Sequence, residues 1–121
     1  MRTSSGRPRK VDLERWDAFM RVGCLACYLW HRYSVPEVHH LLSGTRRRGH
    51  RYTIPLCPAH HRGVGHDESV HGPSLATRPR LFREVFGSDW ELLTLADVLI
   101  EDGLDRRDLN QSERSEVRHG A

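Results

Sequence analysis

Hydrophobic side chains near the start of the chain recur with the period of a helix. They predict a helix over residues 11–22, which ends at Gly23. The same period returns later and predicts helices over residues 80–86 and 89–100. The hydrophobic positions behind these helices are Leu13, Trp16, Phe19 and Met20 in the first, Leu81, Phe82, Val85 and Phe86 in the second, and Trp90, Leu92, Leu93, Leu95, Val98 and Leu99 in the third.

The middle of the chain has shorter hydrophobic runs, which suit strands. Residues 38–42 predict one short strand, and the β-favouring residues 52–56 predict its returning partner. The connection between them is predicted to be a loop. Pro58 suits the first turn of a short helix that continues to Arg62. Residues 66–79 predict a further loop.

These elements predict an α+β fold, ordered as a helix, a hairpin, a short helix and a helical C-terminal part. Residues 11–100 would form one domain, which suits a chain of 121 residues. Residues 1–10 lack hydrophobic periodicity and predict a basic, disordered tail. Residues 101–121 are charged and nearly without aromatic side chains, so they predict a flexible tail.

The composition indicates that the hydrophobic core alone does not stabilise the domain. Only 37% of the residues are hydrophobic, and small domains with a thin core commonly add a metal ion or disulfides. The three cysteines are an odd number, which disfavours a disulfide framework. No hydrophobic stretch is long enough to cross a bilayer, and the start lacks a signal peptide. We therefore expect a cytoplasmic protein with reduced or metal-bound cysteines and no membrane partner.

Charge is unevenly distributed along the chain. Residues 1–80 hold 14 basic and 6 acidic side chains, a balance of +8, whereas residues 81–121 hold 5 and 10, a balance of −5. The basic part indicates a polyanionic partner, and DNA is the candidate. An ordinary solvated surface is the alternative.

Cysteine and histidine spacing predicts a structural zinc site. Cys24 and Cys27 form one Cys-x-x-Cys pair, and Cys57 and His60 form a Cys-x-x-His pair. Two such pairs complete a tetrahedral Cys₃His set, which leaves no open position and is therefore structural. A redox Cys-x-x-Cys is disfavoured because no βαβ pattern surrounds it. The fourth ligand is assigned to His60, with His61 or another histidine as the alternative.

Six further histidines fall within about thirty residues: His39, His40, His50, His61, His66 and His71. Adjacent residues on a strand point to opposite faces. His39 and His40 can therefore divide two tasks, one holding a metal ion and the other taking a proton from water. That division suits metal-assisted hydrolysis.

The histidine-rich segments resemble the HNH, or ββα-metal, nuclease signature. The resemblance implies a small zinc-stapled ββα-metal domain with flanking helices. It is closest to the phage recombination-enhancement nucleases, which cut DNA in dependence on RecA filaments, and it covers residues 20–95. The segments that carry it are Glu37-Val38-His39-His40, Gly49-His50-x-x-Thr53-Ile54, Leu56-Cys57-Pro58-Ala59-His60-His61-Arg62-Gly63, Val70-His71-Gly72 and Leu81-Phe82-Arg83-Glu84-Val85-Phe86-Gly87.

The resemblance also implies roles for single residues. His39 and His61 correspond to ligands of a catalytic divalent ion (zinc, magnesium or manganese), and His40 corresponds to the general base. His50 stands where the family has a residue that orients the base through a backbone contact. Arg62 would clamp a phosphate.

Two roles stay open at this point. The third ligand of the catalytic ion is assigned to His71, with His66 as its competitor, because Gly65 occupies the position where many relatives have that ligand. Glu37 corresponds to an acid that holds an arginine for phosphate contact, and a plain surface role is the alternative.

The sequence therefore predicts a divalent-metal-dependent DNA endonuclease, with a RecA-type filament as partner. DNA contacts are assigned to the arginines of the basic part that lie between and beside the strands, namely Arg46, Arg47, Arg48 and Arg51. The alternatives are a zinc-stabilised DNA-binding module without catalysis, a restriction-type HNH endonuclease, and a protein-interaction domain that uses the acidic part.

Overall fold

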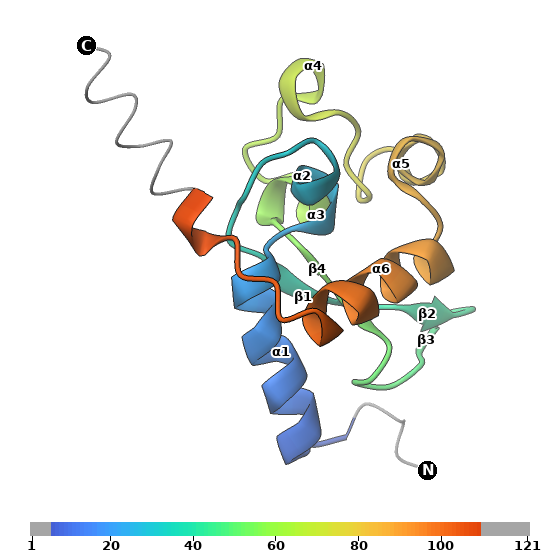
Figure 1. The fold of residues 1–121 in the computed structure, drawn as a ribbon. Coiled ribbons are helices and arrows are strands. Elements are labelled where there is room, and N and C mark those ends of the chain that lie inside the picture. The colour runs from blue at the N-terminus through green and yellow to red at the C-terminus, as the bar shows by residue number, and fades with distance from the viewer. Residues whose placement is uncertain (1–5, 110–121) are drawn as a thin grey trace.

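The computed structural model describes residues 6–109 and confirms the α+β class (Figure 1). Two small antiparallel sheets lie among helices. The elements in chain order are α1 (Lys10–Val22), α2 (Leu25–Leu29), β1 (Glu37–His40), β2 (Leu42–Ser43), β3 (Arg46–Arg47), β4 (Thr53–Leu56), α3 (Pro58–Arg62), α4 (Glu68–His71), α5 (Pro79–Phe86) and α6 (Asp89–Glu101).

Strand β4 is the centre of the domain. All of its residues are buried, and it contacts β1 together with helices α1, α2, α3 and α6. A strand covered on both faces needs a continuous run of residues without exposed polar groups, and Thr53-Ile54-Pro55-Leu56 supplies one. β1 pairs with β4 so that His39 lies opposite Ile54 and His40 opposite Thr53.

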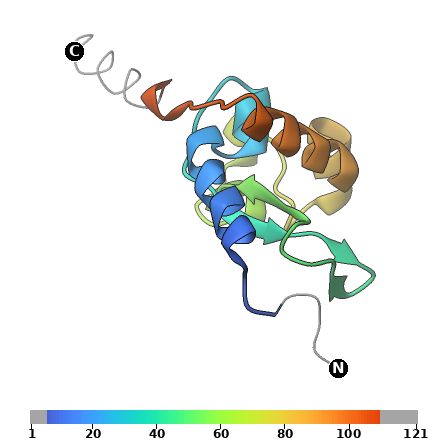
Figure 2. The same cartoon turned by 60° about the horizontal axis from the view of Figure 1, so that its bottom comes forward.

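The connection between β1 and β4 was predicted as a loop, and this prediction was wrong in part. β2 and β3 form a second hairpin there, which projects from the body of the domain (Figures 1 and 2). Its two-residue turn is Gly44-Thr45, and Gly44 has a φ of +68°. Glycine accepts that conformation without strain, which makes the tight turn accessible.

Two short helices were missed. α2 has only 5 residues, too few to show a hydrophobic period. α4 lies within the predicted loop 66–79, and the side chain of Asp67 caps it by accepting a hydrogen bond from the Ser69 backbone N–H.

The buried face of α1 differs from the one that its hydrophobic positions predicted. Phe19 is buried as expected, whereas Leu13 and Met20 are 54% and 39% exposed. Ala18 and Val22 complete the buried face instead. The hydrophobic core of the domain consists mainly of Phe19, Val22, Leu25, Leu41, Ile54, Leu56, Phe82, Phe86, Leu92, Leu93 and Ala96.

The part of the chain after α6 folds back along α1 and α2. The Arg106 backbone N–H donates to the Arg21 carbonyl at 2.7 Å, and its guanidinium lies over the ring of Tyr28. The predicted tails lie partly outside the described residues, since residues 1–5 and 110–121 are not included. Among residues 6–109, no helix combines the length and apolar character that a membrane span requires.

Candidate functional site

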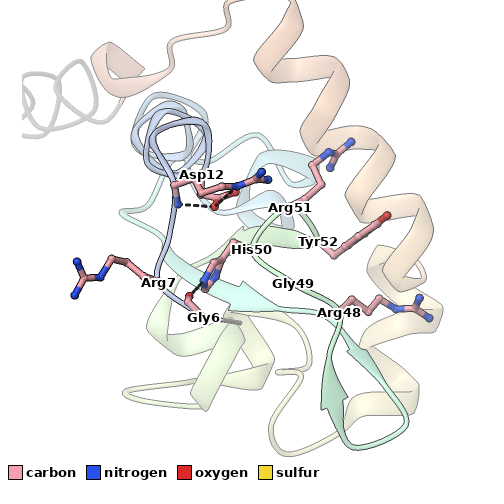
Figure 3. A pocket seen from close by; sticks show the side chains of 9 residues that line it. Gly6, Arg7, Asp12, Arg48, Gly49, His50, Arg51 and Tyr52 are labelled. Carbon is pink, nitrogen blue, oxygen red and sulfur yellow. Dashed lines mark hydrogen bonds and ion pairs between the residues drawn. The ribbon is translucent and has the colours of Figure 1, made fainter. Parts of the chain in front are cut away.

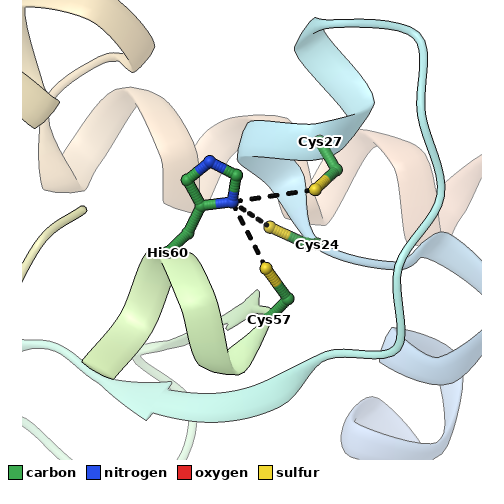
Figure 4. Close-up of side chains that lie close together, drawn as sticks. All are labelled: Cys24, Cys27, Cys57 and His60. Carbon is green, nitrogen blue, oxygen red and sulfur yellow. Dashed lines mark hydrogen bonds between the residues drawn. The ribbon is translucent and has the colours of Figure 1, made fainter. Parts of the chain in front are cut away.

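Four buried side chains meet between α2 and α3. Cys24, Cys27, Cys57 and His60 are 0 to 6% exposed, and their ligand atoms all lie within 4.8 Å of one another. The ring of His60 points its Nδ1 at the three sulfurs (Figure 4). The cluster is the predicted Cys₃His set, with His60 and not His61 as its fourth member.

The spacing of these atoms fits a tetrahedral metal ion. His60 Nδ1 lies 3.6, 3.7 and 3.3 Å from the sulfurs of Cys24, Cys27 and Cys57. A zinc ion with Zn–S near 2.3 Å and Zn–N near 2.0 Å would set these pairs about 3.5 Å apart. The cluster can therefore hold a metal ion such as zinc.

The outer contacts of the cluster orient its ligands. The Nε2–H of His60 donates to the His71 carbonyl at 2.7 Å, which leaves the Nδ1 lone pair facing the sulfurs. The Ser34 hydroxyl donates to Cys27 Sγ at 3.0 Å. Such second contacts hold the tautomer and the position of metal ligands.

The protonation of the cluster suits a cation at its centre. Burial raises the pKa of the Cys24 thiol well above its ordinary value, whereas hydrogen bonds from Cys24 and Cys27 lower the pKa of Cys57. Burial alone would lower the pKa of His60, but its hydrogen bonds with Cys27 and Cys57 raise it to about 10. One thiolate is thus stabilised by protons on its neighbours, and a metal ion would take the place of those protons.

A second group of histidines lies on the other flank of α3. His39 Nδ1 and His61 Nε2 are 3.1 Å apart. Two nitrogens that share one divalent ion are separated by about 3.0–3.4 Å, depending on the coordination angle. His61 Nδ1 lies 2.9 Å from a Glu37 carboxylate oxygen, which can only accept, so the lone pair of a neutral His61 faces His39.

Glu37 is the anchor of this flank. Its carboxylate also accepts two hydrogen bonds from Arg62, one of them 2.9 Å long. These bonds from Arg62, followed by the one from His61, lower the pKa of Glu37. Burial, then the neighbouring His61, lowers the pKa of His39 to about 4. His39 is therefore neutral at neutral pH, as a metal ligand must be.

On the opposite face of β1, His40 pairs with His50. His40 Nε2 and His50 Nδ1 are 2.9 Å apart, and His50 Nε2 donates to the carbonyl of Gly6. Because that carbonyl can only accept, a neutral His50 keeps its lone pair on Nδ1 and receives the His40 Nε2–H. The remaining lone pair of His40 is then on Nδ1.

His40 is consequently neutral and held in one tautomer. Burial, with the charge of Arg47 and the neighbouring His50, lowers the pKa of His40 to about 4. The contact between the two histidines is made by their rings, whereas a backbone contact was expected for His50. His39 and His40 face opposite sides of the strand, in agreement with the alternation expected from sequence.

Thr53 anchors this histidine pair through its hydroxyl, and these contacts were not predicted, although Thr53 belongs to the Gly49-His50-x-x-Thr53-Ile54 segment of the family resemblance. Its hydroxyl donates to the His50 carbonyl at 2.9 Å and accepts from Trp16 Nε1 at 3.0 Å and Arg15 Nε at 3.3 Å. One donor and two lone pairs are all that a hydroxyl has. The ring of Trp16 meets the rings of His50 and His40 edge-on, with centroids 5.2 and 5.9 Å away.

Replacing Thr53 by valine should lower the free energy of unfolding by about 2 kcal/mol, because it leaves buried hydrogen-bonding groups without a partner. Urea denaturation monitored by circular dichroism measures the change. Thr53→Ser keeps the hydroxyl and should lose about 1 kcal/mol through its missing methyl group. If Thr53→Ser is as unstable as Thr53→Val, the hydroxyl is not the anchor.

The predicted third ligand of the catalytic ion does not join His39 and His61. His66 and His71 lie around His60, with ring centroids 5.8 and 6.2 Å from it. Within residues 6–109, the Cys₃His cluster is the one group of three or more potential ligands that come this close together. His71 stays beside His60 because α4 ends at His71 and the His71 carbonyl accepts a hydrogen bond from the Nε2–H of His60.

The four arginines assigned to DNA contact lie in two settings. Arg46 and Arg47 are exposed on β3 of the projecting hairpin. Arg51 forms a 2.8 Å ion pair with Asp97, and the guanidinium of Arg48 lies over the ring of Trp90. The first two therefore lie on the exposed hairpin, where the charge of Arg47 also acts on His40, whereas the last two contact α6.

Comparison with known proteins gives one family match. No curated protein sequence matches the chain. Residues 8–101 match the family described as "Recombination enhancement, RecA-dependent nuclease", and this range contains both histidine groups and the Cys₃His cluster. The match confirms the resemblance to the recombination-enhancement nucleases, and the chain belongs to this family of RecA-dependent nucleases.

Proposed function

We propose that this nuclease is a divalent-metal-dependent DNA endonuclease of the HNH type, with zinc in the Cys₃His cluster. The observation that carries the proposal is the pair of histidine contacts on the two faces of β1, His39 with His61 and His40 with His50. One pair offers nitrogen ligands at metal spacing, and the other offers an oriented neutral base.

Each of these histidines has its own role in phosphodiester cleavage. His39 and His61 hold the catalytic ion, and Glu37 fixes the tautomer of His61. A divalent ion held there would polarise the scissile phosphate and stabilise the leaving oxygen. His40 takes a proton from the attacking water at Nδ1, while His50 and the Gly6 carbonyl keep its other nitrogen protonated.

Arginine side chains supply the contacts to the DNA backbone. Arg62 is 56% exposed while it holds Glu37, so its remaining N–H groups can reach a phosphate. Arg46 and Arg47 on the projecting hairpin suit contact with the backbone further along the strand. None of these contacts reads base identity, so a RecA filament on DNA would supply the selection of the target.

Cleavage should depend on both a divalent ion and the recombinase filament. We expect the purified protein to nick DNA carrying a RecA filament when magnesium or manganese is present, and to lose this activity when the divalent ion is omitted. Gel analysis of end-labelled DNA measures the products. The control variant is His31→Asn, at an exposed histidine with a φ of +61° that asparagine tolerates.

The opposite result would identify a DNA-binding module. If the protein binds DNA in a salt-dependent manner and makes no cuts under any of these conditions, the catalytic proposal is wrong and the zinc cluster alone remains.

A further inference from the structure

We propose that Tyr52, Trp90, Arg48 and Arg51 form a stacking subsite for an unpaired nucleotide next to the catalytic histidines. The proposal rests on the proposed function, since it takes the substrate to be DNA. It adds a site that recognises the face of a base, where the contacts above recognise only phosphates.

The aromatic part of the subsite is accessible. Trp90 lies in the first turn of α6 and is 53% exposed. Tyr52 is half-buried and meets Trp90 edge-on, with ring centroids 6.2 Å apart. The two rings join the end of the 49–52 turn to α6 and present aromatic surface to solvent.

Guanidinium groups accompany both rings. Arg48 lies 4.9 Å from the Trp90 ring centroid and Arg51 lies 5.8 Å from that of Tyr52. Figure 3 shows Arg48, Arg51 and Tyr52 extending in the same direction, toward α6. Alternating aromatic and guanidinium groups are how proteins hold single-stranded nucleic acid, because bases stack on the rings while arginine binds phosphate or stacks in turn.

Arg48, Arg51 and Tyr52, but not Trp90, also line a pocket of about 440 Å³, within the usual size range of small-molecule sites. Its walls are the 48–52 segment on one side and the N-terminal segment, with Gly6, Arg7 and Arg9, on the other (Figure 3). His50 lines the same pocket and holds His40. A nucleotide in it would therefore be a near neighbour of the one that is cut.

The chemistry of the pocket favours an unpaired strand over duplex DNA. Its four arginines face two carboxylates, Asp12 within the pocket and Asp97 beside it, so the surroundings are net positive and suit a phosphate. A base inside a duplex has both faces covered by its neighbours, whereas an unpaired base can place one face on Trp90 or Tyr52.

The test separates base stacking from phosphate attraction. Fluorescence anisotropy measures the affinity of the full-length protein, without added divalent ion, for three labelled probes: oligothymidylate, an abasic strand of equal length, and a duplex. We expect oligothymidylate to bind about tenfold more tightly than the abasic strand. Trp90→Leu keeps apolar contact with Tyr52 but removes the larger π-face, so it should remove most of that difference and leave abasic binding unchanged. Trp90→Phe should retain most of it.

Two results would overturn the subsite. Equal affinity of the parent for the base-containing and abasic strands would show that bases are not contacted, and an equal loss for both strands in Trp90→Leu would assign Trp90 a structural role. Because no step of the measurement involves cleavage, failure of the subsite and failure of the nuclease proposal are observed separately.

Discussion

Replacing Cys57 with serine is expected to leave the protein without a cooperative unfolding transition at 25 °C. Cys57 is buried at the start of α3, and its sulfur faces Cys24, Cys27 and His60. Structural zinc contributes on the order of 10 kcal/mol of apparent binding free energy, comparable with the whole stability of a small domain at about 5–15 kcal/mol. The substitution removes a thiolate ligand, so the protein loses most of its free energy of unfolding. Circular dichroism in urea and metal analysis of the purified protein measure both effects.

Two variants at the same cluster provide matched controls. His60→Cys creates a Cys₄ set, which also binds zinc, so it should keep one bound zinc and a cooperative transition. Ser34→Ala removes only the hydrogen bond to Cys27 and should weaken metal affinity by about 10- to 100-fold without unfolding the protein. A Cys57→Ser variant that unfolds at the parent's urea midpoint would show that the cluster does not stabilise the fold through a metal.

The Cys₃His cluster was predictable because the two ligands of each pair are close together in the sequence. Two ligands in each pair are separated by two residues, and a short helical turn is enough to make them converge. The hairpin and α3 followed from equally local signals, namely β-favouring residues and Pro58. α2, β2 and β3 were missed, because they are too short for a hydrophobic period and carry no local signal such as Pro58.

The partners of the histidines were predictable only in part. Alternation along β1 predicts opposite faces for His39 and His40, and that expectation agrees with their contacts. The hydrogen bonds of the Thr53 hydroxyl depend on Arg15 and Trp16, which are 38 and 37 residues away in sequence. The 63–72 segment illustrates the same limit, because the spacing of His66 and His71 could not reveal that they turn toward His60.

Replacing His40 with alanine is expected to lower the rate of DNA cleavage by about 10²- to 10⁴-fold, the range that removal of a general base typically costs. Hydrogen bonding and ring contacts join His40 to His50 and Trp16, which are not part of the Cys₃His cluster. The fold and the bound zinc should therefore be retained. Single-turnover cleavage of DNA carrying a RecA filament, at saturating divalent ion, measures the rate.

The comparison with His39→Ala separates the base from the metal ligand. His39→Ala should require a higher concentration of divalent ion, because it removes one of two nitrogens that lie 3.1 Å apart. His40→Ala should keep the parent's dependence on the ion and lose only the maximal rate, and added imidazole should restore part of it by occupying the vacated space. Equal cleavage by His40→Ala and the parent would exclude His40 as the base. A shared shift in ion dependence would instead place both histidines at the metal.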